Sequence, residues 1–329
     1  MAGFARLQAG QIRRTGPQVS GRPAHLGRCS PLGRLAGAIE AGLHAIARCT
    51  IWTRVPAVTR SALTQIRLRY VTEARSLDAT MEAALKADQR AGAKSILNAV
   101  AQRRFDNRSE GQRLRKLLRY ERALWAGGVL RVAGVDEAGM SPLAGPVAAA
   151  AVIFAPGSRL AGIDDSKKLD ATCRDRLAAE IKQVALAWCV AFAEVQEIDS
   201  INIYWAGQLA MRRAIEGLCL APEHVLLDAR RLKELKLPQH AIVKGDSKSM
   251  TIAAASILAK TARDALMLRL DAEHPGYGFG RHKGYPVREH LLALKQLGAS
   301  AIHRRSFAPV RAVLGLPPLP PWPDRGQGA

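Results

Sequence analysis

Four acidic side chains follow three apolar runs of the chain, and their spacing suggests hydrolytic chemistry. Asp136 and Glu137 end one run, Asp228 ends a second, and Asp246 follows a third. If the three runs are strands, these carboxylates can meet at one edge of a sheet. Carboxylates held that close repel one another, so the arrangement persists only if divalent cations or protons neutralise it. The alternative interpretation, without a catalytic role, is that the paired acids simply lie in a solvated loop at the end of a strand.

Hard oxygen ligands favour Mg²⁺ or Mn²⁺ over zinc. Two such ions about 3.5–4 Å apart can activate water and stabilise a leaving 3′-oxygen during attack on a phosphodiester. An apolar strand ending in Asp-Glu also occurs in P-loop ATPases, but those require an upstream G-x-x-x-x-G-K-[ST] segment, which this sequence lacks. The residues therefore predict a metal-dependent phosphodiesterase that acts on nucleic acid.

The composition supports a polyanionic partner and excludes several classes of protein. The 329 residues include 49 Lys and Arg against 28 Asp and Glu, a net charge of +21. No apolar run approaches the ~18–20 residues of a membrane span, so we expect no membrane association. Five cysteines without a C-x-x-C pair argue against a disulfide scaffold or cysteine-built zinc site and favour a reducing compartment. We expect a cytoplasmic monomer.

The positive charge is concentrated in front of the part that we expect to be compact. Residues 1–60 carry +8, residues 61–130 carry +7, and the remaining residues carry only +6. We interpret 1–60 as a disordered Arg-rich extension. It could be a nucleic-acid-binding arm, an organelle presequence or a wrongly included leader, or it could have no specific function.

Residues 61–128 predict a helical, basic extension that binds substrate. Asp78 can cap one helix, and later helices bury apolar faces before Gly127 and Gly128 end the segment. A basic run near its end suggests phosphate contacts, although such a run is usually just a solvated face. That run contains Arg103, Arg104, Arg108, Arg113, Arg115 and Lys116.

Residues 129–315 alternate strands and helices, which predicts an α/β domain with a mixed sheet flanked by helices and a helical C-terminal module. The runs 130–136 and 147–154 are joined by a turn too short for a crossover helix, so they should pair antiparallel. Further strands are expected at 188–195, up to Asp228 and at 241–244. Helices are expected near 172–187, 197–217, 249–271 and 286–298. The proline-rich residues 316–329 are interpreted as a loose tail.

From about Val132 to Gly315 the chain resembles bacterial ribonuclease HII, the type-2 ribonuclease H. One short match would be weak evidence, whereas an ordered series is strong. The series runs Gly-Val-Asp-Glu-Ala-Gly (134–139), Pro-Leu-Ala-Gly-Pro-Val (142–147), Asp-Ser-Lys-Lys-Leu (165–169), Glu-Ile-Asp-x-Ile-Asn-Ile (197–203), Lys-Gly-Asp-Ser (244–247), Ile-Ala-Ala-Ala-Ser-Ile-Leu-Ala-Lys (252–260), His-Lys-Gly-Tyr (282–285) and His-Arg-Arg-Ser-Phe (303–307). Residues 1–60 have no counterpart in the family.

The resemblance implies a ribonuclease H-like fold and an endoribonuclease that uses Mn²⁺ or Mg²⁺. Its substrates would be RNA–DNA hybrids and duplex DNA containing ribonucleotides, cut to leave a 3′-hydroxyl and a 5′-phosphate. The four acids of the family fall on the four acids already identified from strand ends. The implied substrate contacts are Gly139, Met140 and Ser141 on the ribose, Lys167 and Lys168 on phosphate, and Tyr285 against the sugar.

Two positions depart from the family pattern. The family reads Asp-Glu-x-Gly-Arg-Gly, where this chain has Gly139, Met140 and Ser141. Ser141 in place of glycine is expected to restrict φ, and Met140 removes a guanidinium that could meet a phosphate. Both changes should weaken recognition of the RNA–DNA junction. Ala229 replaces the usual glycine after Asp228, which we expect to shift the loop only slightly.

Two rival functions remain open from the sequence: a nuclease of the same fold with weakened junction specificity, and a non-catalytic nucleic-acid-binding relative. The second predicts loss of at least one acid, yet all four are present. Lys260 and Arg263 could face either the acids or solvent. Histidines in the C-terminal module lack metal-ligand spacing and predict no zinc site. Asn202 is expected to satisfy local backbone groups.

Overall fold

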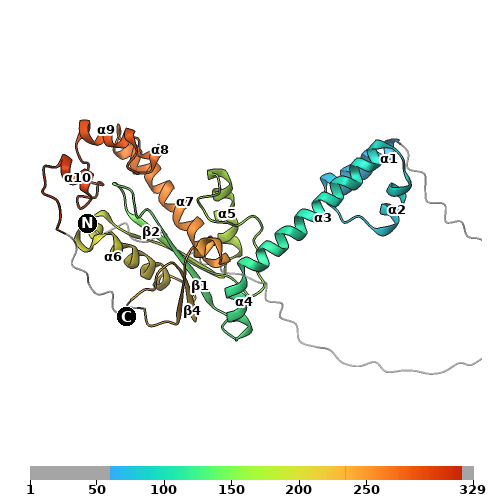
Figure 1. Ribbon diagram of the computed structural model, residues 1–329, viewed down its shortest axis with the longest axis horizontal. Coiled ribbons are helices and arrows are strands. Elements are labelled where there is room, and N and C mark those ends of the chain that lie inside the picture. Colours follow the sequence, from blue (N-terminus) through green and yellow to red (C-terminus); the bar gives the residue numbers. More distant parts are fainter. Residues whose placement is uncertain (1–59, 234, 321–329) are drawn as a thin grey trace, which may run out of the picture. The chain divides into compact units, whose positions relative to one another are not determined.

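The computed structural model describes residues 60–233 and 235–320, drawn as coloured ribbon in Figure 1. They form two compact units that divide between Asn107 and Arg108. The interpretation of residues 1–60 as a disordered extension falls outside the described residues, apart from Arg60, and most of the predicted tail does too. None of the described helices is long and apolar enough to cross a membrane.

The unit before residue 108 is helical, as the sequence predicts. It contains α1 (Arg60–Arg67), a π-helical turn (Leu68–Thr72), α2 (Ala79–Ala87) and the first part of α3 (Ala91–Leu117). Asp78 caps α2 by accepting a hydrogen bond from the Met81 amide at 2.8 Å. The small core of this unit contains Ile66, Tyr70, Leu77, Leu85, Ala93, Ile96 and Val100.

The unit from residue 108 onward is built on one five-stranded mixed sheet in the order β3-β2-β1-β4-β5. The strands are β1 (Val132–Ala138), β2 (Val147–Ile153), β3 (Ala187–Ala193), β4 (His224–Asp228) and β5 (Gln239–Ile242). β2 is antiparallel to β1 and β3, whereas β4 is parallel to β1 and β5. The structure confirms the mixed sheet and the predicted antiparallel first pair.

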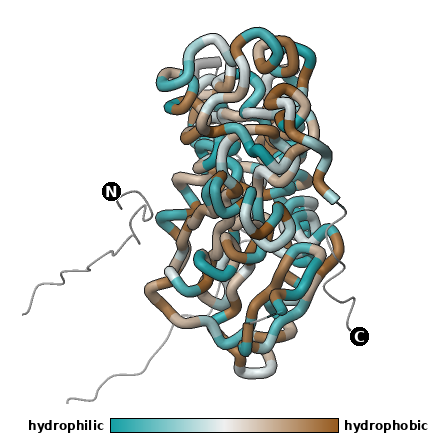
Figure 2. Tube along the Cα trace, turned by 90° about the vertical axis from the view of Figure 1, so that its left-hand side faces the viewer, coloured by the Kyte–Doolittle hydropathy of each residue, from teal (hydrophilic) through white to brown (hydrophobic). Residues whose placement is uncertain are grey.

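Helices cover both faces of the sheet (Figure 1). α5 (Ala171–Val184) and α7 (Met250–Glu273) share a core with one face, and α6 (Val195–Glu216) packs on the other. α7 approaches β1 so closely that a Cβ on Gly134 would lie 2.1 Å from the backbone of Thr251. Figure 2 shows hydrophobic and hydrophilic stretches alternating along the trace, as two-sided elements require.

Asn202 interrupts α6 with a left-handed φ of 70°. Its side-chain oxygen accepts a hydrogen bond from the Trp205 amide at 3.1 Å, which caps the second half of the helix. The expectation that Asn202 satisfies local backbone groups is confirmed.

The C-terminal module is helical, with α8 (Phe279–His282), α9 (Arg288–Leu297) and α10 (Ala308–Val313). The sequence predicts only α9, because α8 and α10 are too short to show periodicity. His290 and His303 are buried, and their Nε2 atoms lie 3.1 Å apart. The structure therefore places both histidines in the interior of this module.

A buried carboxylate joins α4 (Arg119–Ala126) to the start of α7. Oε1 of Glu121 accepts hydrogen bonds from the Ser249 hydroxyl (2.6 Å), the Thr251 amide (2.9 Å) and the Thr251 hydroxyl (2.9 Å). A negative charge at a helix N-terminus is favourable because the free amides and the helix dipole point at it. Glu121 therefore fixes the start of α7, the helix that packs along β1.

We expect Glu121→Ala to lower the free energy of unfolding by about 2–4 kcal/mol, because buried donors lose their acceptor. Urea unfolding of the full chain measures this change. Glu180→Gln is the control, since Glu180 forms only a solvent-exposed ion pair with Arg176 and should change stability by less than about 1 kcal/mol. Equal effects of the two variants would contradict the anchoring role.

Candidate active site

Asp136 and Asp228 lie side by side on neighbouring parallel strands. The register pairs Val135 of β1 with Leu227 of β4, so the next residue on each strand is an aspartate. Gly134, two residues before Asp136, packs on α7, and side chains two residues apart share a face. Both carboxylates therefore belong to the face covered by α7. Asp136 is buried there, with only 4% of its surface exposed.

Asp246 reaches the same place from a turn. β5 ends at Ile242, and Asp246 sits in the short 3₁₀ turn Gly245–Ser247 that leads into α7. The expected strand at 241–244 is thus wrong at its C-terminal end, because Lys244 adopts a left-handed φ of 57° that terminates the extended backbone. The Gly245 amide donates a 2.6 Å hydrogen bond to Oδ1 of Asp228, which ties the turn to β4.

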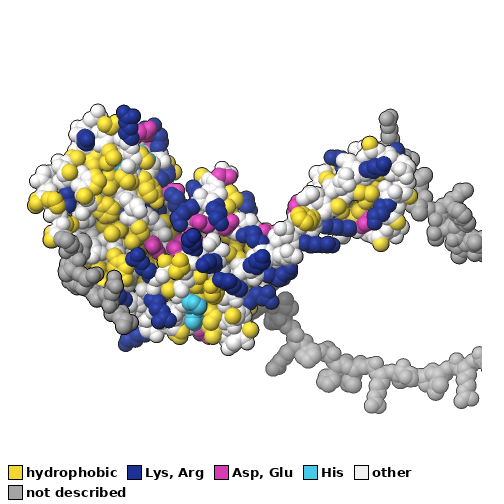
Figure 3. All heavy atoms as spheres, viewed as in Figure 1, with side chains coloured by type: hydrophobic (Ala, Val, Ile, Leu, Met, Phe, Trp, Pro, Cys, Tyr) yellow, Lys and Arg dark blue, Asp and Glu magenta, His cyan; other side chains and the backbone are white. Residues whose placement is uncertain are grey.

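Glu137 belongs to the opposite face of β1, because successive residues of a strand alternate. It is nevertheless close enough to Asp228 for the two charges to interact. The four acids identified from the sequence thus gather at one edge of the sheet, with Asp136, Asp228 and Asp246 on the α7 side. Figure 3 shows acidic side chains beside a group of Lys and Arg side chains on this unit.

Burial and mutual repulsion make three of these carboxylates, those of Asp136, Glu137 and Asp228, hard to ionise. Burial raises the pKa of Asp136 well above its usual range, and the charges of Glu137 and Asp228 raise it further. Burial and then Asp228 raise the pKa of Glu137. The pKa of Asp228 is raised by burial and by Asp246, although the Gly245 amide opposes the shift.

The residues fit a divalent cation. Within the described residues no three possible ligands already converge as a metal-binding group. The side chain of Lys167 provides a positive charge next to the acids. Its ammonium lies 3.3 Å from Oδ2 of Asp246 and 4.0 Å from Oδ1 of Asp165. The Lys167 side chain is 77% exposed, so it can leave without disturbing the core. All-oxygen carboxylate ligands suit Mg²⁺ or Mn²⁺.

Lys168 does not share the position of its neighbour. Its ammonium pairs with Asp164 at 3.0 Å. Tyr285, in the C-terminal module, is 37% exposed, and its backbone carbonyl lies 2.9 Å from Nδ1 of His290. Of the two lysines expected to contact phosphate, the structure brings Lys167 to the acids.

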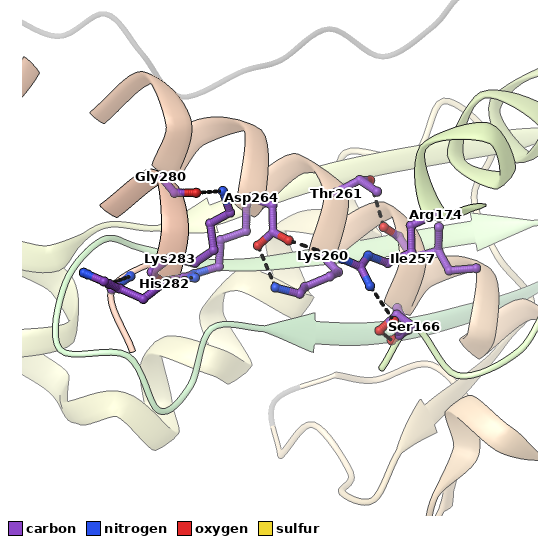
Figure 4. A network of polar contacts seen from close by, with 12 residues as sticks. Ser166, Arg174, Ile257, Lys260, Thr261, Asp264, Gly280, His282 and Lys283 are labelled. Carbon is purple, nitrogen blue, oxygen red and sulfur yellow. Dashed lines mark hydrogen bonds and ion pairs between the residues drawn. The ribbon is translucent and has the colours of Figure 1, made fainter. Parts of the chain in front are cut away.

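Lys260 and Arg263 face neither the acids nor open solvent. Lys260 binds Asp264 at 2.6 Å, and Arg174, whose guanidinium lies 3.9 Å from Asp264, also donates to the Ser166 carbonyl (Figure 4). This network connects α7 to the loop that carries Lys167.

Two buried arginines hold the turn that follows β1. Arg263 donates to the carbonyls of Pro146 (2.9 Å), Ala144 (3.0 Å) and Lys283 (3.0 Å). Arg304 donates to the carbonyls of Gly145 (2.9 Å), Met140 (3.0 Å) and Gly139 (2.6 Å). Burial lowers the pKa of Arg263 to about 10 and that of Arg304 to about 9, so both stay charged at neutral pH. Sequence reasoning assigned no role to Arg304.

The turn after β1 depends on Gly139. Gly139 has a φ of 93°, and a Cβ there would lie 2.0 Å from Nε of Arg263, so this glycine is required. Ser141 is not among the described non-glycine residues with a positive φ, so its side chain is not forced into the left-handed region. Met140 packs against the core, with its sulfur 3.0 Å from where a Cβ on Gly207 would lie.

The second departure from the family pattern has a larger cost than the sequence suggests. Ala229 adopts a left-handed φ of 55° directly after Asp228. This conformation costs a residue with a Cβ roughly 1–2 kcal/mol. A 3.0 Å hydrogen bond from its amide to the Ile242 carbonyl holds it in place. The sequence predicts only a slight shift of the loop, whereas the structure shows backbone strain at Ala229, directly after Asp228.

Residues 133–310 match the family model for ribonuclease HII. The chain is 59% identical to the ribonuclease HII of Anaeromyxobacter sp. (strain Fw109-5) over 80% of this chain and 83% of that protein. It is 55% identical to the ribonuclease HII of Myxococcus xanthus (strain DK1622) over 80% of this chain and 90% of that protein. The chain belongs to the ribonuclease HII family. It is therefore a ribonuclease H-type hydrolase, an endoribonuclease that acts on RNA–DNA hybrids.

Among solved structures, the ribonuclease H2 of Pyrococcus horikoshii OT3 is 25% identical, with a TM-score of 0.48 over 56% of this chain and 97% of that one. Ribonuclease HII membership and the mixed sheet confirm the predicted fold class.

The raised pKa values predict that the active site costs stability when no metal is bound. Folded Asp136, Glu137 and Asp228 hold protons at pH values where the unfolded chain, with pKa near 3.8 for Asp and 4.5 for Glu, has lost them. The free energy of unfolding should therefore fall as pH rises above about 4 through the folded pKa values.

We expect Asp136→Asn to raise the melting temperature in EDTA at pH 7 by several degrees and to flatten its dependence on pH. About 1 kcal/mol corresponds to roughly 2–4 °C for a domain of this size. Thermal unfolding between pH 5 and 8 measures both effects, with the exposed Asp175→Asn as control. A lower melting temperature for Asp136→Asn would show that its carboxylate is not destabilised by its surroundings.

Proposed function

We propose that this ribonuclease HII cleaves the RNA strand of RNA–DNA hybrids and single ribonucleotides embedded in duplex DNA, leaving a 3′-hydroxyl and a 5′-phosphate. Asp136, Glu137, Asp228 and Asp246 hold two Mg²⁺ or Mn²⁺ ions. The observation that carries the proposal is the gathering of four carboxylates at one sheet edge, three of them with raised pKa values, beside a removable lysine.

The bound ions supply an activated water and stabilise the charge on the leaving oxygen. The protein chain holds the acidic side chains in position. The Gly245 amide orients Asp228, and the start of α7 fixes the turn that carries Asp246. A cation bound by Asp246 would take the place of the Lys167 ammonium, and Lys167 could then contact a phosphate of the substrate. Lys168 and Tyr285 complete the proposed contacts, with Tyr285 against the sugar.

The turn at 139–141 reads the ribose through its amides. The carbonyls of Gly139 and Met140 are already engaged by Arg304. Within the described residues, by contrast, no acceptor is seen for the amides of Met140 and Ser141. A 2′-hydroxyl distinguishes RNA from DNA and can accept such a donor. Because Met140 packs against the core and carries no charge, one phosphate contact of the family pattern is missing.

The helical segment 61–128 is proposed to contribute to substrate binding through its basic residues. Three of them are already engaged within the protein. Arg103 donates to two backbone carbonyls, Arg104 donates to one backbone carbonyl and to Glu82, and Arg113 pairs with Glu110. Arg108, Arg115 and Lys116 are exposed. We further propose that the protein acts as a monomer in the cytoplasm.

Cleavage of two labelled duplexes tests the proposed activity: one with a single ribonucleotide, and one with an all-RNA strand opposite DNA. We expect metal-dependent cutting of both, with cutting of the first on the 5′ side of the ribonucleotide. Asp228→Asn should lower the rate on both by at least about a hundredfold while leaving duplex affinity within a few-fold. Asp175→Asn should cut normally. Unchanged turnover by Asp228→Asn in excess Mn²⁺ would refute the assignment of the acids.

The role of the turn predicts a selective effect of restoring the family pattern. Met140→Arg combined with Ser141→Gly should raise efficiency on the single-ribonucleotide duplex by on the order of tenfold, and less on the all-RNA hybrid. One charge-assisted phosphate contact is worth roughly 1.5–3 kcal/mol. Ser141→Gly alone should change little, since Ser141 does not adopt a positive φ that a glycine would relieve. Equal gains on both substrates would show that the turn does not read the junction.

A further inference from the structure

A cavity of about 540 Å³ lies between the C-terminal part of α3, α4 and the loop after β2. All of its lining residues belong to the unit from residue 108 onward. They come from other segments of the chain than the four acids do. Its volume falls within the ~300–1,000 Å³ typical of small-molecule sites.

Three arginines line this cavity: Arg115, Arg122 and Arg159. All three are exposed, and within the described part of the chain none of them forms an ion pair with a carboxylate. Arg122 lies three residues after Arg119 in α4, and like charges at this helical spacing repel. An anion bound in the cavity would relieve this repulsion.

One wall of the cavity is apolar. Leu114, Leu118 and Trp125 line it beside the arginines. Leu114 and Leu118 belong to the buried core of the unit, and Trp125 packs against that core, so the wall is preformed. A planar aromatic ligand gains affinity from such a surface, and stacking of a base on an aromatic side chain is worth roughly 1–3 kcal/mol. Figure 3 shows Lys and Arg side chains gathered around the α4 region.

We propose that this cavity binds a nucleotide, with its phosphate on the arginines and its base against the apolar wall. The arginines would bind the anionic phosphate, and the apolar wall would bind the planar base attached to it. The nucleotide can be free or an unpaired residue at a strand end. The site is separate from the four carboxylates, which repel phosphate when no metal is bound.

Calorimetry on the full chain in EDTA tests the proposal, because the catalytic acids then cannot hold a phosphate. AMP should bind at least about tenfold more tightly than inorganic phosphate or adenosine, since only AMP engages both parts of the cavity. An oligonucleotide with an unpaired 5′-phosphorylated end, compared with a blunt duplex, identifies which source of nucleotide is preferred.

Arg115→Ala combined with Arg159→Ala should weaken AMP binding by at least about tenfold. Arg108→Ala combined with Lys116→Ala is the matched control, since it removes the same charge from exposed positions that do not line the cavity. An unchanged far-ultraviolet circular dichroism spectrum and melting temperature verify that the first variant is folded. Absence of AMP binding to the wild type, or an equal loss in the control, would overturn the proposal. So would equal binding of AMP and phosphate.

Discussion

Negative charge held close together and away from water is the constraint on which this structure depends. Asp136, Asp228 and Asp246 lie close together, and the raised pKa values of Asp136 and Asp228 show that these two do not ionise freely. The register of β1 and β4 puts two of them side by side, and the Gly245 amide ties the third to that pair. A site arranged in this way favours cation binding, because a cation neutralises the repulsion between the carboxylates. Metal-dependent hydrolysis needs this property.

Polar interactions inside the unit hold the surroundings of the acids in place. Glu121 fixes the start of α7 from α4, while Arg263 and Arg304 each gather three carbonyls around the turn after β1. These groups are costly to bury and are nearly all satisfied by hydrogen bonds, which makes the turn rigid. Strain at Ala229 is retained beside Asp228 in the same region. Stability is thus lower at the sheet edge where we propose that the chemistry takes place.

The acids and most of the fold could be predicted from the sequence because local patterns encode them. An apolar run that ends in a carboxylate identifies Asp136 and Asp228 without any knowledge of the fold. The short link between the first two strands predicts their antiparallel pairing. The bonds of Arg263 and Arg304 could not be predicted, since their carbonyl partners come from distant parts of the sequence. Nor could the positive φ angles at Ala229 and Lys244, which depend on how each turn packs. The left-handed Lys244 also explains why the strand before Asp246 ends earlier than its apolar pattern suggests.

The central claim is that the four carboxylates form one site for divalent cations in this ribonuclease HII. Direct titration of the full chain with Mn²⁺ tests it, with the free ion followed by electron paramagnetic resonance. The account predicts two Mn²⁺ bound per chain, and loss of at least one when Asp228→Asn and Asp246→Asn are added. Undiminished Mn²⁺ binding after removal of both carboxylates would contradict it.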